Sequence, residues 1–417
     1  MNEHVNGALP RIMHIDLNSC FAMVEQQARP HLRGRPLGVT NRLTRHACMI
    51  ALSYEAKRKG AKVGMRRDEV QALVPDLCVI ETDPPKYHYV YQKLVAIMKS
   101  YSPNVMMKSI DEGVIDFTGM QPAGEAALTK IGVEVKQRLR EQIGGYITCN
   151  IGISTNRFLA KLAAGQNKPN GMTAIYGEGI RPWLGRLQLT DLPGIASHYE
   201  ARLNSVGILT PLEFWAAPAH ILRGQVFRSK IGDDWHQRLR GWEVDDYVTR
   251  LGSVGRQYVL DGATREEAVL VNRLAHLSYS AARKLRYNNR AARGIYVYAR
   301  LQTGDVWQSR KMHKASFYSD RAVLERAMYL FNSRPRHLLV KEMGVTCYGL
   351  EPLAAVLGQP DLFGESLREE NLTEAMDDIN DTHGLGTIIF APAIGANAQI
   401  KQKLPFGSTK YFELLCG

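Results

Sequence analysis

The sequence predicts an α+β protein with two separate mixed α/β units. Residues 11–172 show the order strand, helix, hairpin, helix, strand, which is the βαββαβ order of a ferredoxin-like sheet, with a basic insert after the first helix. Residues 253–349 give strand, helix, two strands, helix and strand. The apolar fraction of 45% over 417 residues is enough for several cores. We therefore expect several domains.

The charge of the chain is large and uneven. The net charge is +12, yet residues 351–390 contain nine acidic residues and one basic residue. Residues 391–417 contain three basic residues and one acidic residue. Residues 1–350 therefore hold a formal net charge of about +18 at neutral pH. A body this basic favours a polyanionic partner, most simply nucleic acid.

Several classes of protein are disfavoured by the composition. The chain contains no run of 18 apolar residues and no charged-then-apolar leader, so we expect neither a membrane span nor a secretory signal. Its six cysteines are scattered without paired spacing. This distribution argues against a zinc site or a disulfide framework and favours a reducing, cytoplasmic location.

The first strand of the predicted sheet is Arg11–Asp16, and it ends on a carboxylate. We expect Asn18 to cap the helix that follows, which buries Phe21. Taken alone, Asp16 is equally well explained as a capping residue.

The predicted hairpin, residues 105–118, holds two adjacent acids between apolar, β-rich runs. Gly113 suits a tight turn, so Asp111 and Glu112 are expected at or beside the tip. Acidic neighbours are common on solvated helices, but between apolar runs a charged pair is costly unless it binds something. Together with Asp16, these acids offer three carboxylates that share one sheet. Such a set suffices for two Mg²⁺ ions acting on an in-line displacement at phosphorus.

The basic insert, residues 31–83, contains a second candidate site. Tyr54 and Lys57 lie three residues apart, so on a helix they share a face. A hydroxyl and an ammonium that converge there can hold a triphosphate. On spacing alone, a solvated basic helix is the simpler explanation.

Five separate motifs occur along the chain. They are HIDLNSCFAMVE (14–25), ALSYEAK (51–57), SIDEGVIDFTG (109–119), NIGISTNRFLAKLAAGQNKPNG (150–171) and LTDLPGI (189–195). In order and spacing they resemble the Y-family translesion DNA polymerases, in the bacterial group of polymerase IV and UmuC. The resemblance covers about residues 11–350. It implies a right-handed polymerase with a ferredoxin-like palm, small fingers, a helical thumb and a βαββαβ little finger.

The resemblance also implies domain limits. They are palm 1–30 and 84–172, fingers 31–83, thumb 173–242, linker 243–252, little finger 253–350, and an acidic tail 351–417 with a clamp-binding motif.

The resemblance assigns roles to residues of the catalytic site. Asp16, Asp111 and Glu112 match the metal-binding carboxylates, and the Leu17 carbonyl matches a further ligand. Phe21 matches the aromatic steric gate under the sugar.

The nucleotide site includes matches and departures. Tyr54, Lys57 and Lys161 match triphosphate contacts. Asn18 stands where many members have a second Asp, and Ala51 stands where a Thr usually touches the phosphates. Lys57 replaces the usual Arg and cannot make its planar bidentate contact. The Asn18 departure is expected to be harmless, because the Asp of the family at that position is not a main ligand. The departures at Ala51 and Lys57 lead us to expect weaker nucleotide binding or an altered base preference.

DNA contacts are expected in the thumb and the little finger. Gly194, in the LPGI turn near a helix start, can offer backbone amides to a phosphate, although a helical domain without DNA contact also fits. In the little finger the central hairpin is expected at 293–301 and 306–312. A solvated helix face is an alternative for the cluster 283–290. The candidate phosphate contacts are Arg283, Lys284, Arg286, Arg290, Arg293, Arg310, Lys311 and Lys314.

The acidic tail contains QPDLF (359–363), which resembles the bacterial sliding-clamp-binding pentapeptide. Gln359, Leu362 and Phe363 are its predicted contacts, and a loop packed on the domain is the alternative. Residues 372–387 resemble the carboxyl-terminal segment of UmuC-like members.

The resulting hypothesis is a template-directed, low-fidelity DNA polymerase that bypasses damaged bases with two Mg²⁺ ions. Its expected partners are primer–template DNA, dNTPs and the sliding clamp. It is expected to be a monomer without proofreading, and whether it needs UmuD-like or RecA-like partners is left open. A non-catalytic adaptor that binds DNA and clamp, and a nucleotide cyclase on the same palm, are the rival hypotheses.

Overall fold

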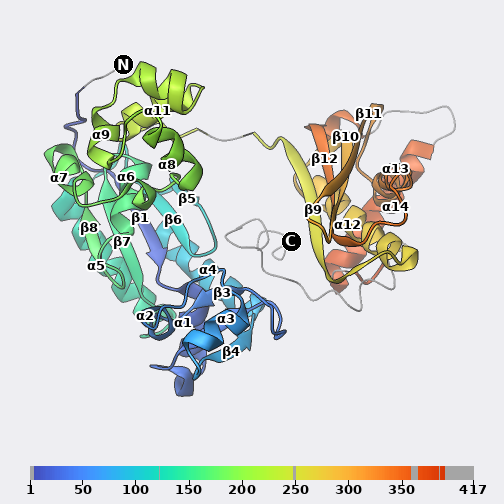
Figure 1. The fold of residues 1–417 in the computed structure, drawn as a ribbon, viewed down its shortest axis with the longest axis horizontal. Helices are drawn as coiled ribbons and strands as arrows, with labels where there is room; N and C mark the ends of the chain where they lie inside the picture. Colours follow the sequence, from blue (N-terminus) through green and yellow to red (C-terminus); the bar gives the residue numbers. More distant parts are fainter. Residues whose placement is uncertain (1–3, 122, 248–249, 358–364, 385, 390–417) are drawn as a thin grey trace. The chain divides into compact units, whose positions relative to one another are not determined.

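The computed structural model describes residues 4–121, 123–247, 250–357, 365–384 and 386–389 (Figure 1). The chain separates into two compact units between residues 248 and 249, within the predicted linker. In the described residues, no helix combines the length and apolar character needed to cross a bilayer. Each unit is described by itself.

The first unit is built on a five-stranded sheet with the order β5-β6-β1-β7-β8 (Figure 1). β1 is antiparallel to both β6 and β7, and β8 is added in parallel at the edge. Apart from β8, this is the ferredoxin-like order, so the predicted fold is confirmed. The elements are β1 (Ile12–Leu17), α1 (Cys20–Ala28), α4 (Pro84–Lys99), β5 (Val105–Met107), β6 (Glu112–Asp116), α5 (Glu125–Gln142), β7 (Cys149–Ser154), α6 (Arg157–Ala164) and β8 (Met172–Ala174).

Two helices pack on opposite faces of this sheet, and β7 shows why. Successive side chains of a strand point to opposite faces. Ile151 lies beside Gly132 of α5, whereas Gly152 faces α6. A Cβ at Gly152 would lie 1.9 Å from the Ala160 carbonyl oxygen, so only glycine allows α6 to approach this closely. The α6 face of the sheet therefore carries the even-numbered residues of β1 and β6.

Two local predictions about this sheet are wrong. Gly113 is not in the turn but within β6, opposite Met107, where a Cβ would lie 2.7 Å from the methionine sulfur. Asn18 does not cap α1, because Ser19 occupies the N-cap position in the left-handed conformation (φ 43°). The Asn18 side chain is buried and bonds to neighbouring strands and loops instead.

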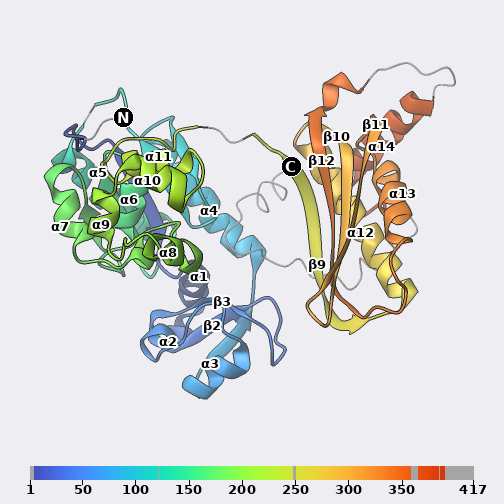
Figure 2. The ribbon, with the colours of Figure 1, turned by 45° about the horizontal axis from the view of Figure 1, so that its top comes forward.

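The insert after α1 forms a small three-stranded sheet with the order β3-β2-β4, seen below the main sheet in Figure 2. Its core contains Met49, Leu52, Val70 and Val74, all fully buried. The elements are η1 (Pro30–Leu32), β2 (Leu37–Thr40), β3 (Met49–Leu52), α2 (Tyr54–Arg58), α3 (Arg67–Leu73) and β4 (Cys78–Glu81).

A helical region follows β8 and completes the first unit. Its core is aromatic, with Phe214, Phe227 and Trp235 in mutual ring contact, and Phe158 of α6 packs edge-on against Trp235. The helical region is therefore anchored to the sheet through α6. Its elements are η2 (Gly177–Gly179), α7 (Ile180–Leu184), η3 (Leu189–Asp191), α8 (Ser197–Asn204), α9 (Pro211–Ala216), α10 (Ala219–Ile221), a π-helical turn (Leu222–Val226) and α11 (Ile231–Arg238).

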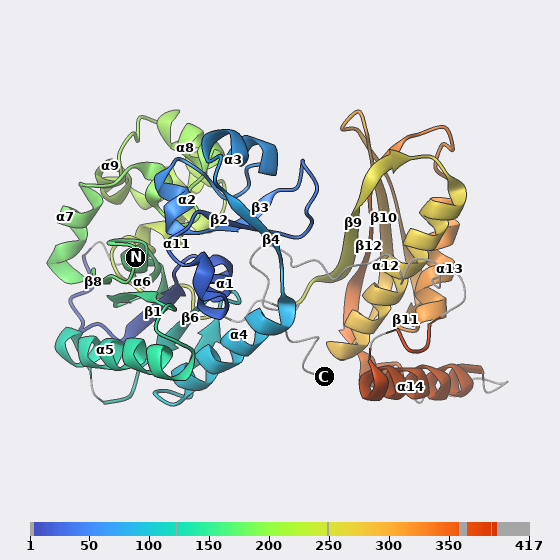
Figure 3. The ribbon, with the colours of Figure 1, turned by 90° about the horizontal axis from the view of Figure 1, so that it is seen from below.

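The second unit is an antiparallel four-stranded sheet with the order β11-β10-β12-β9 and helices on one face (Figure 3). The predicted hairpin is present but longer than expected, and β11 lies at the sheet edge. Leu274 of α12 and Phe331 of α13 pack with Ile295 of β10 in the core. The elements are β9 (Ser253–Thr264), α12 (Glu267–Tyr287), β10 (Arg290–Leu301), β11 (Val306–Phe317), α13 (Asp320–Phe331), β12 (Val340–Pro352), η5 (Leu353–Ala355) and α14 (Glu365–His383).

Candidate active site

The three predicted carboxylates lie at one end of the central strands. Asp16 of β1 and Glu112 of β6 are direct cross-strand neighbours, and Asp111 immediately precedes β6. The Leu17 N–H donates to the Asp111 carbonyl oxygen at 2.8 Å, which fixes the two strand ends together. The fold thus brings residues about a hundred positions apart to one edge of the sheet.

Each of the outer carboxylates is paired with a lysine. Lys168 Nζ lies 2.8 Å from Asp16 Oδ2, and Lys161 Nζ of α6 lies 2.8 Å from Glu112 Oε1. His14 is buried two residues before Asp16, on the same face of β1. Its Nε2 lies 3.0 Å from Glu112 Oε2. Asp111 accepts a hydrogen bond from the Ser109 hydroxyl. Two cations therefore already sit against this cluster of acids.

The environments of the acids move their pKa values in opposite directions. Burial alone would raise the pKa of Glu112, but the hydrogen bond with His14 and the Lys161 ammonium lower this pKa to about 2. Burial raises the pKa of Asp111, and the charges of Asp16 and Glu112 add to this rise against the Ser109 hydrogen bond. Of these acids, Asp111 is therefore the one whose ionised form is disfavoured by its surroundings.

The donor set fits a hard divalent cation. All three side chains offer oxygen, which Mg²⁺ prefers, and their mutual repulsion is what an added cation would relieve. Among the described residues, no three carboxylate, imidazole or thiol groups converge closely enough to hold an ion as they stand. In this structure each of the three carboxylates has a protein partner: Lys168 for Asp16, the Ser109 hydroxyl for Asp111, and Lys161 for Glu112.

Phe21, the predicted sugar gate, lies on α1 near these acids. Its ring stacks on Tyr87 of α4, with the centroids 4.4 Å apart and the planes inclined by 24°. The Tyr87 hydroxyl donates to Glu25 Oε1 at 2.9 Å, and Lys86 pairs with the other oxygen of that carboxylate at 2.8 Å. A buried, fully partnered network thus holds the ring beneath Phe21.

The predicted triphosphate contacts Tyr54 and Lys57 lie together on α2. Lys57 Nζ is 5.0 Å from the centre of the Tyr54 ring and 2.7 Å from Ser19 Oγ. The pKa of Lys57 is lowered by burial and by the neighbouring Lys168 charge. Ala51 is buried in β3, just before this helix. Tyr54, Lys57 and Lys168 are therefore neighbours, whereas Lys161 lies on Glu112.

Sequence reasoning missed three residues of this site. Lys168 belongs to the NKPNG end of a quoted motif, which was a usable signal, but only folding brings it to Asp16. His14 precedes Asp16 by two residues in a strand and so shares its face. Nothing in the local sequence of Tyr87 indicates that it supports Phe21.

In the helical region, Gly194 lies in the turn before α8. Its φ of 95° is left-handed, and a Cβ there would lie 3.5 Å from the Trp235 ring. The turn conformation thus requires glycine.

Two of the predicted DNA contacts have acidic partners in this structure. The Arg286 side chain is 8% exposed, and it forms ion pairs with Asp320 at 2.9 Å and with Asp377 of α14 at 2.6 Å. Arg283 pairs with Asp381 and Asp377, also on α14. Both guanidinium groups are therefore paired with acids of the second unit in this structure.

The other predicted contacts differ in exposure. Lys284 and Arg290 are partly buried, with Lys284 at the carboxyl end of α12. Lys311 lies with its Nζ 4.4 Å from the Tyr329 ring centre on α13. The exposed members of the set are Arg293, Arg310, Lys311 and Lys314. The predicted clamp contacts Gln359, Leu362 and Phe363 lie outside the described residues.

Comparison with known protein families identifies both units. The model of the impB/mucB/samB family matches residues 15–165, and the model of the family's C-terminal domain matches residues 252–362. DNA polymerase IV of Moorella thermoacetica is 32% identical over 384 residues, covering 89% of this chain and 93% of that protein. DNA polymerase IV of Bacillus anthracis is 28% identical over 381 residues, covering 90% and 91%.

Solved structures give the same fold. A Y-family DNA polymerase chimera aligns with a TM-score of 0.71 at 23% identity, covering 81% of this chain and 98% of that chain. An insertion ternary complex of Dbh DNA polymerase aligns with a TM-score of 0.56 at 22% identity and the same coverage. The family models and the 32% identical relative carry the assignment, and the fold agrees with it. This chain therefore belongs to the impB/mucB/samB family of Y-family, translesion DNA polymerases.

Proposed function

We propose that this polymerase adds dNTPs to a primer 3′-hydroxyl opposite intact and damaged template bases, at the acidic edge of its five-stranded sheet. The observation that carries the proposal is the juxtaposition of Asp16 with Glu112 across two strands, with Asp111 beside them. Their arrangement works against the ionised form of Asp111, whose pKa is raised by burial and further by the charges of Asp16 and Glu112, so a bound cation would favour it.

We assign Asp16, Asp111 and Glu112, with the Leu17 carbonyl, as the ligands of two Mg²⁺ ions. When bound, such ions increase the acidity of the primer hydroxyl and neutralise charge on the triphosphate and the leaving pyrophosphate. The protein itself contributes positioning and fixed charge. His14 supports this role by holding one Glu112 oxygen from a buried position, so that the carboxylate keeps its orientation.

The lysines that now pair with the acids are well suited to change partners. Lys161 and Lys168 are partly exposed, with 43% and 34% of the side chain accessible. Because both ammonium groups are partly accessible, a phosphate oxygen can reach them while a metal ion takes over the carboxylates. We infer that both ammonium groups, together with Tyr54 and Lys57, bind the triphosphate.

Sugar selection is assigned to Phe21. A 2′-hydroxyl would require space that the Phe21 ring fills, and the stacked Tyr87 ring prevents Phe21 from moving away. The site therefore discriminates by a rigid apolar wall, since an unpaired hydroxyl against it is unfavourable.

DNA binding is assigned to the turn at Gly194 and to exposed arginine and lysine side chains of the second unit. Arg293, Arg310, Lys311 and Lys314 are the members whose side chains are exposed. Contacts of this kind bind phosphates without reading sequence, as a polymerase requires. Arg283 and Arg286 are left out of this set because α14 already pairs with them.

The QPDLF segment is assigned to binding of the bacterial sliding clamp, in the cytoplasm. Replacing Leu362 and Phe363 by alanine is expected to abolish the stimulation of extension by a purified clamp. Stimulation that survives this double change would contradict the assignment. Extension by the purified protein alone would show that UmuD-like and RecA-like proteins are not required.

The catalytic assignment is tested by single-nucleotide insertion during a Mg²⁺ titration. The changes Asp16→Asn, Asp111→Asn and Glu112→Gln are each expected to reduce insertion at least about a thousandfold, as removal of main transition-state contacts does. Asp116→Asn is the matched control, since Asp116 lies on the same face of β6 but pairs with Arg157 at 2.8 Å. Equal losses for Asp116→Asn and Asp111→Asn would refute the assignment.

A further inference from the structure

The loop of residues 166–171 joins α6 to β8 and carries Lys168 to the acidic edge of the sheet. Lys168 Nζ reaches Asp16 Oδ2 at 2.8 Å. Two residues of this short loop, Asn167 and Asn170, have positive φ values of 51° and 59°, a conformation that asparagine tolerates better than most residues. The loop therefore has a defined shape that something must hold.

A buried pair of asparagines holds the loop from the sheet side. Asn150 is fully buried, its Nδ2 donates to the Gln166 carbonyl at 2.6 Å, and its Oδ1 accepts from the Gly171 amide at 3.0 Å. Asn150 thus binds both ends of the loop with one side chain. Asn18 is 1% exposed, and its Oδ1 accepts from the Asn170 amide at 2.8 Å.

The two asparagines are also bonded to each other. Asn18 Nδ2 donates to Asn150 Oδ1 at 3.1 Å, and Asn18 Oδ1 accepts a second hydrogen bond from Thr148 Oγ1 at 2.9 Å. Asn150 is the cross-strand neighbour of Asp16 on β7, just as Glu112 is on β6. An Asp at position 18 has no N–H to donate to Asn150, so this network requires the amide that the chain has there.

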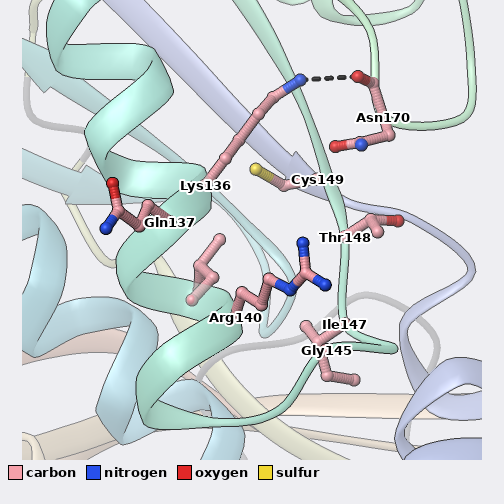
Figure 4. Close-up of a pocket in the computed structure, with 9 residues that line it drawn as sticks. Lys136, Gln137, Arg140, Gly145, Ile147, Thr148, Cys149 and Asn170 are labelled. Carbon is pink, nitrogen blue, oxygen red and sulfur yellow. Dashed lines mark hydrogen bonds between the residues drawn. The ribbon is translucent and has the colours of Figure 1, made fainter.

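Lys136 of α5 holds the same loop from the opposite side. Its Nζ donates to the Asn170 carbonyl at 2.6 Å and to the Gly171 carbonyl at 3.0 Å. Figure 4 shows the Lys136 side chain extending from α5 past Cys149 to Asn170, along a cavity of about 250 Å³. The Lys136 ammonium thus donates to two backbone carbonyls, and hydrogen bonds from a charged donor are stronger than those from a neutral one.

We propose that Asn18, Asn150 and Lys136 form a clamp that positions Lys168 for the incoming triphosphate. The inference rests on the proposed function, because it assigns these three as positioning residues for nucleotide binding. Five hydrogen bonds from these three side chains reach the backbone of the six-residue loop, and the two asparagines are buried, so a shift of the loop would leave buried polar groups without partners. The charged group on that loop which reaches the catalytic acids is Lys168.

The clamp makes a quantitative prediction about coupling between Lys136 and Lys168. Lys136→Met keeps the aliphatic stem and removes the ammonium, and it is expected to raise the dNTP KM roughly tenfold, with little change in kcat or in primer–template affinity. Lys168→Ala is expected to raise this KM by a similar factor. Because both changes remove the same contact, the double variant should raise the KM about as much as Lys168→Ala alone, not by the product. A purely structural role for Lys136 would give multiplicative effects.

Hydrogen exchange of the protein without DNA or nucleotide tests the clamp separately from polymerase activity. Exchange of the 166–171 amides is expected to accelerate in Lys136→Met and in Asn150→Ala, and to stay unchanged in Lys168→Ala. Lys130→Met, an exposed lysine on the same helix, is the control and should change neither exchange nor KM. Unchanged exchange in both clamp variants, or multiplicative KM effects, would overturn the inference. Failure of wild-type extension, with loop exchange as expected, would instead contradict the proposed function alone.

Discussion

Asp16 and Glu112 face each other across β1 and β6, and each has a lysine Nζ 2.8 Å from one of its carboxylate oxygens. Neither lysine comes from the two strands: Lys161 lies on α6 and Lys168 on the loop after it. Lysine side chains of the same chain therefore pair with the acidic edge. A metal ion would compete with these lysines for the carboxylates, and a triphosphate would compete with the carboxylates for the lysines. This relationship connects metal binding with nucleotide binding in one small region.

Asp111→Asn is expected to inactivate the enzyme and also to stabilise it in the absence of metal. The pKa of Asp111 is raised by burial and by two neighbouring carboxylates, so its ionised form at neutral pH destabilises the folded state. Removing that charge should increase the free energy of unfolding by roughly 1 kcal/mol. Thermal melts in EDTA measure this, and a lower melting temperature than wild type would contradict the account.

Phe21→Ala is expected to admit ribonucleotides. The change removes the ring that stacks on Tyr87 and opens space under the sugar, so the preference for dNTP over rNTP should fall at least about tenfold. Tyr87→Phe is the matched control, because it keeps the supporting ring and loses only the hydrogen bond to Glu25. Single-nucleotide insertion with paired dNTP and rNTP titrations decides, and unchanged sugar selectivity in Phe21→Ala would remove the gate role.

Lys57→Arg is expected to lower the dNTP KM. Lys57 reaches Ser19 with a single ammonium, whereas a guanidinium at the same position can bind two phosphate oxygens at once. Lys57→Ala should raise the KM by roughly tenfold, the effect of losing one charged contact. Steady-state titration of each dNTP measures both changes, and coinciding KM values for wild type and Lys57→Arg would show that the lysine is no handicap.

Substitutions of Arg286 and Arg310 are expected to affect different properties, the first the stability of the second unit and the second its binding to DNA. Arg286→Met leaves Asp320 and Asp377 without their shared partner, so the second unit should lose about 3–5 kcal/mol of stability. Arg310→Ala removes an exposed charge, so the melting temperature should stay constant while the salt dependence of DNA affinity falls by about one ion. The reverse pattern in melts and binding titrations would refute this division of roles.

The main sheet and its acids were predictable because their signals are local. Short apolar, β-rich runs indicate the strands, and Asp16, Asp111 and Glu112 follow or interrupt such runs at recognisable positions. The turn was misplaced by a few residues because glycine serves two purposes. Gly113 lies within β6 without a positive φ, where Met107 and Met98 pack closely against it.

The remaining errors concern pairing over long distances in sequence. Arg286 and Asp377 are 91 residues apart, and no periodic pattern shows that α14 docks on α12. Asn18 resembles a helix cap in sequence, but its burial beside Asn150 gives its side chain stronger partners than the helix amides. In each case the partner of a polar side chain is distant in the sequence and is identified only in the folded chain.

The most direct test of the central claim is primer extension by the purified protein with four dNTPs and Mg²⁺. It should use an undamaged template and a template with one abasic site, with Asp111→Asn and Asp116→Asn as the paired variants. The account predicts extension on both templates, lost in Asp111→Asn and retained in Asp116→Asn. No extension on either template, together with tight binding to primer–template and clamp, would contradict it and support the non-catalytic adaptor.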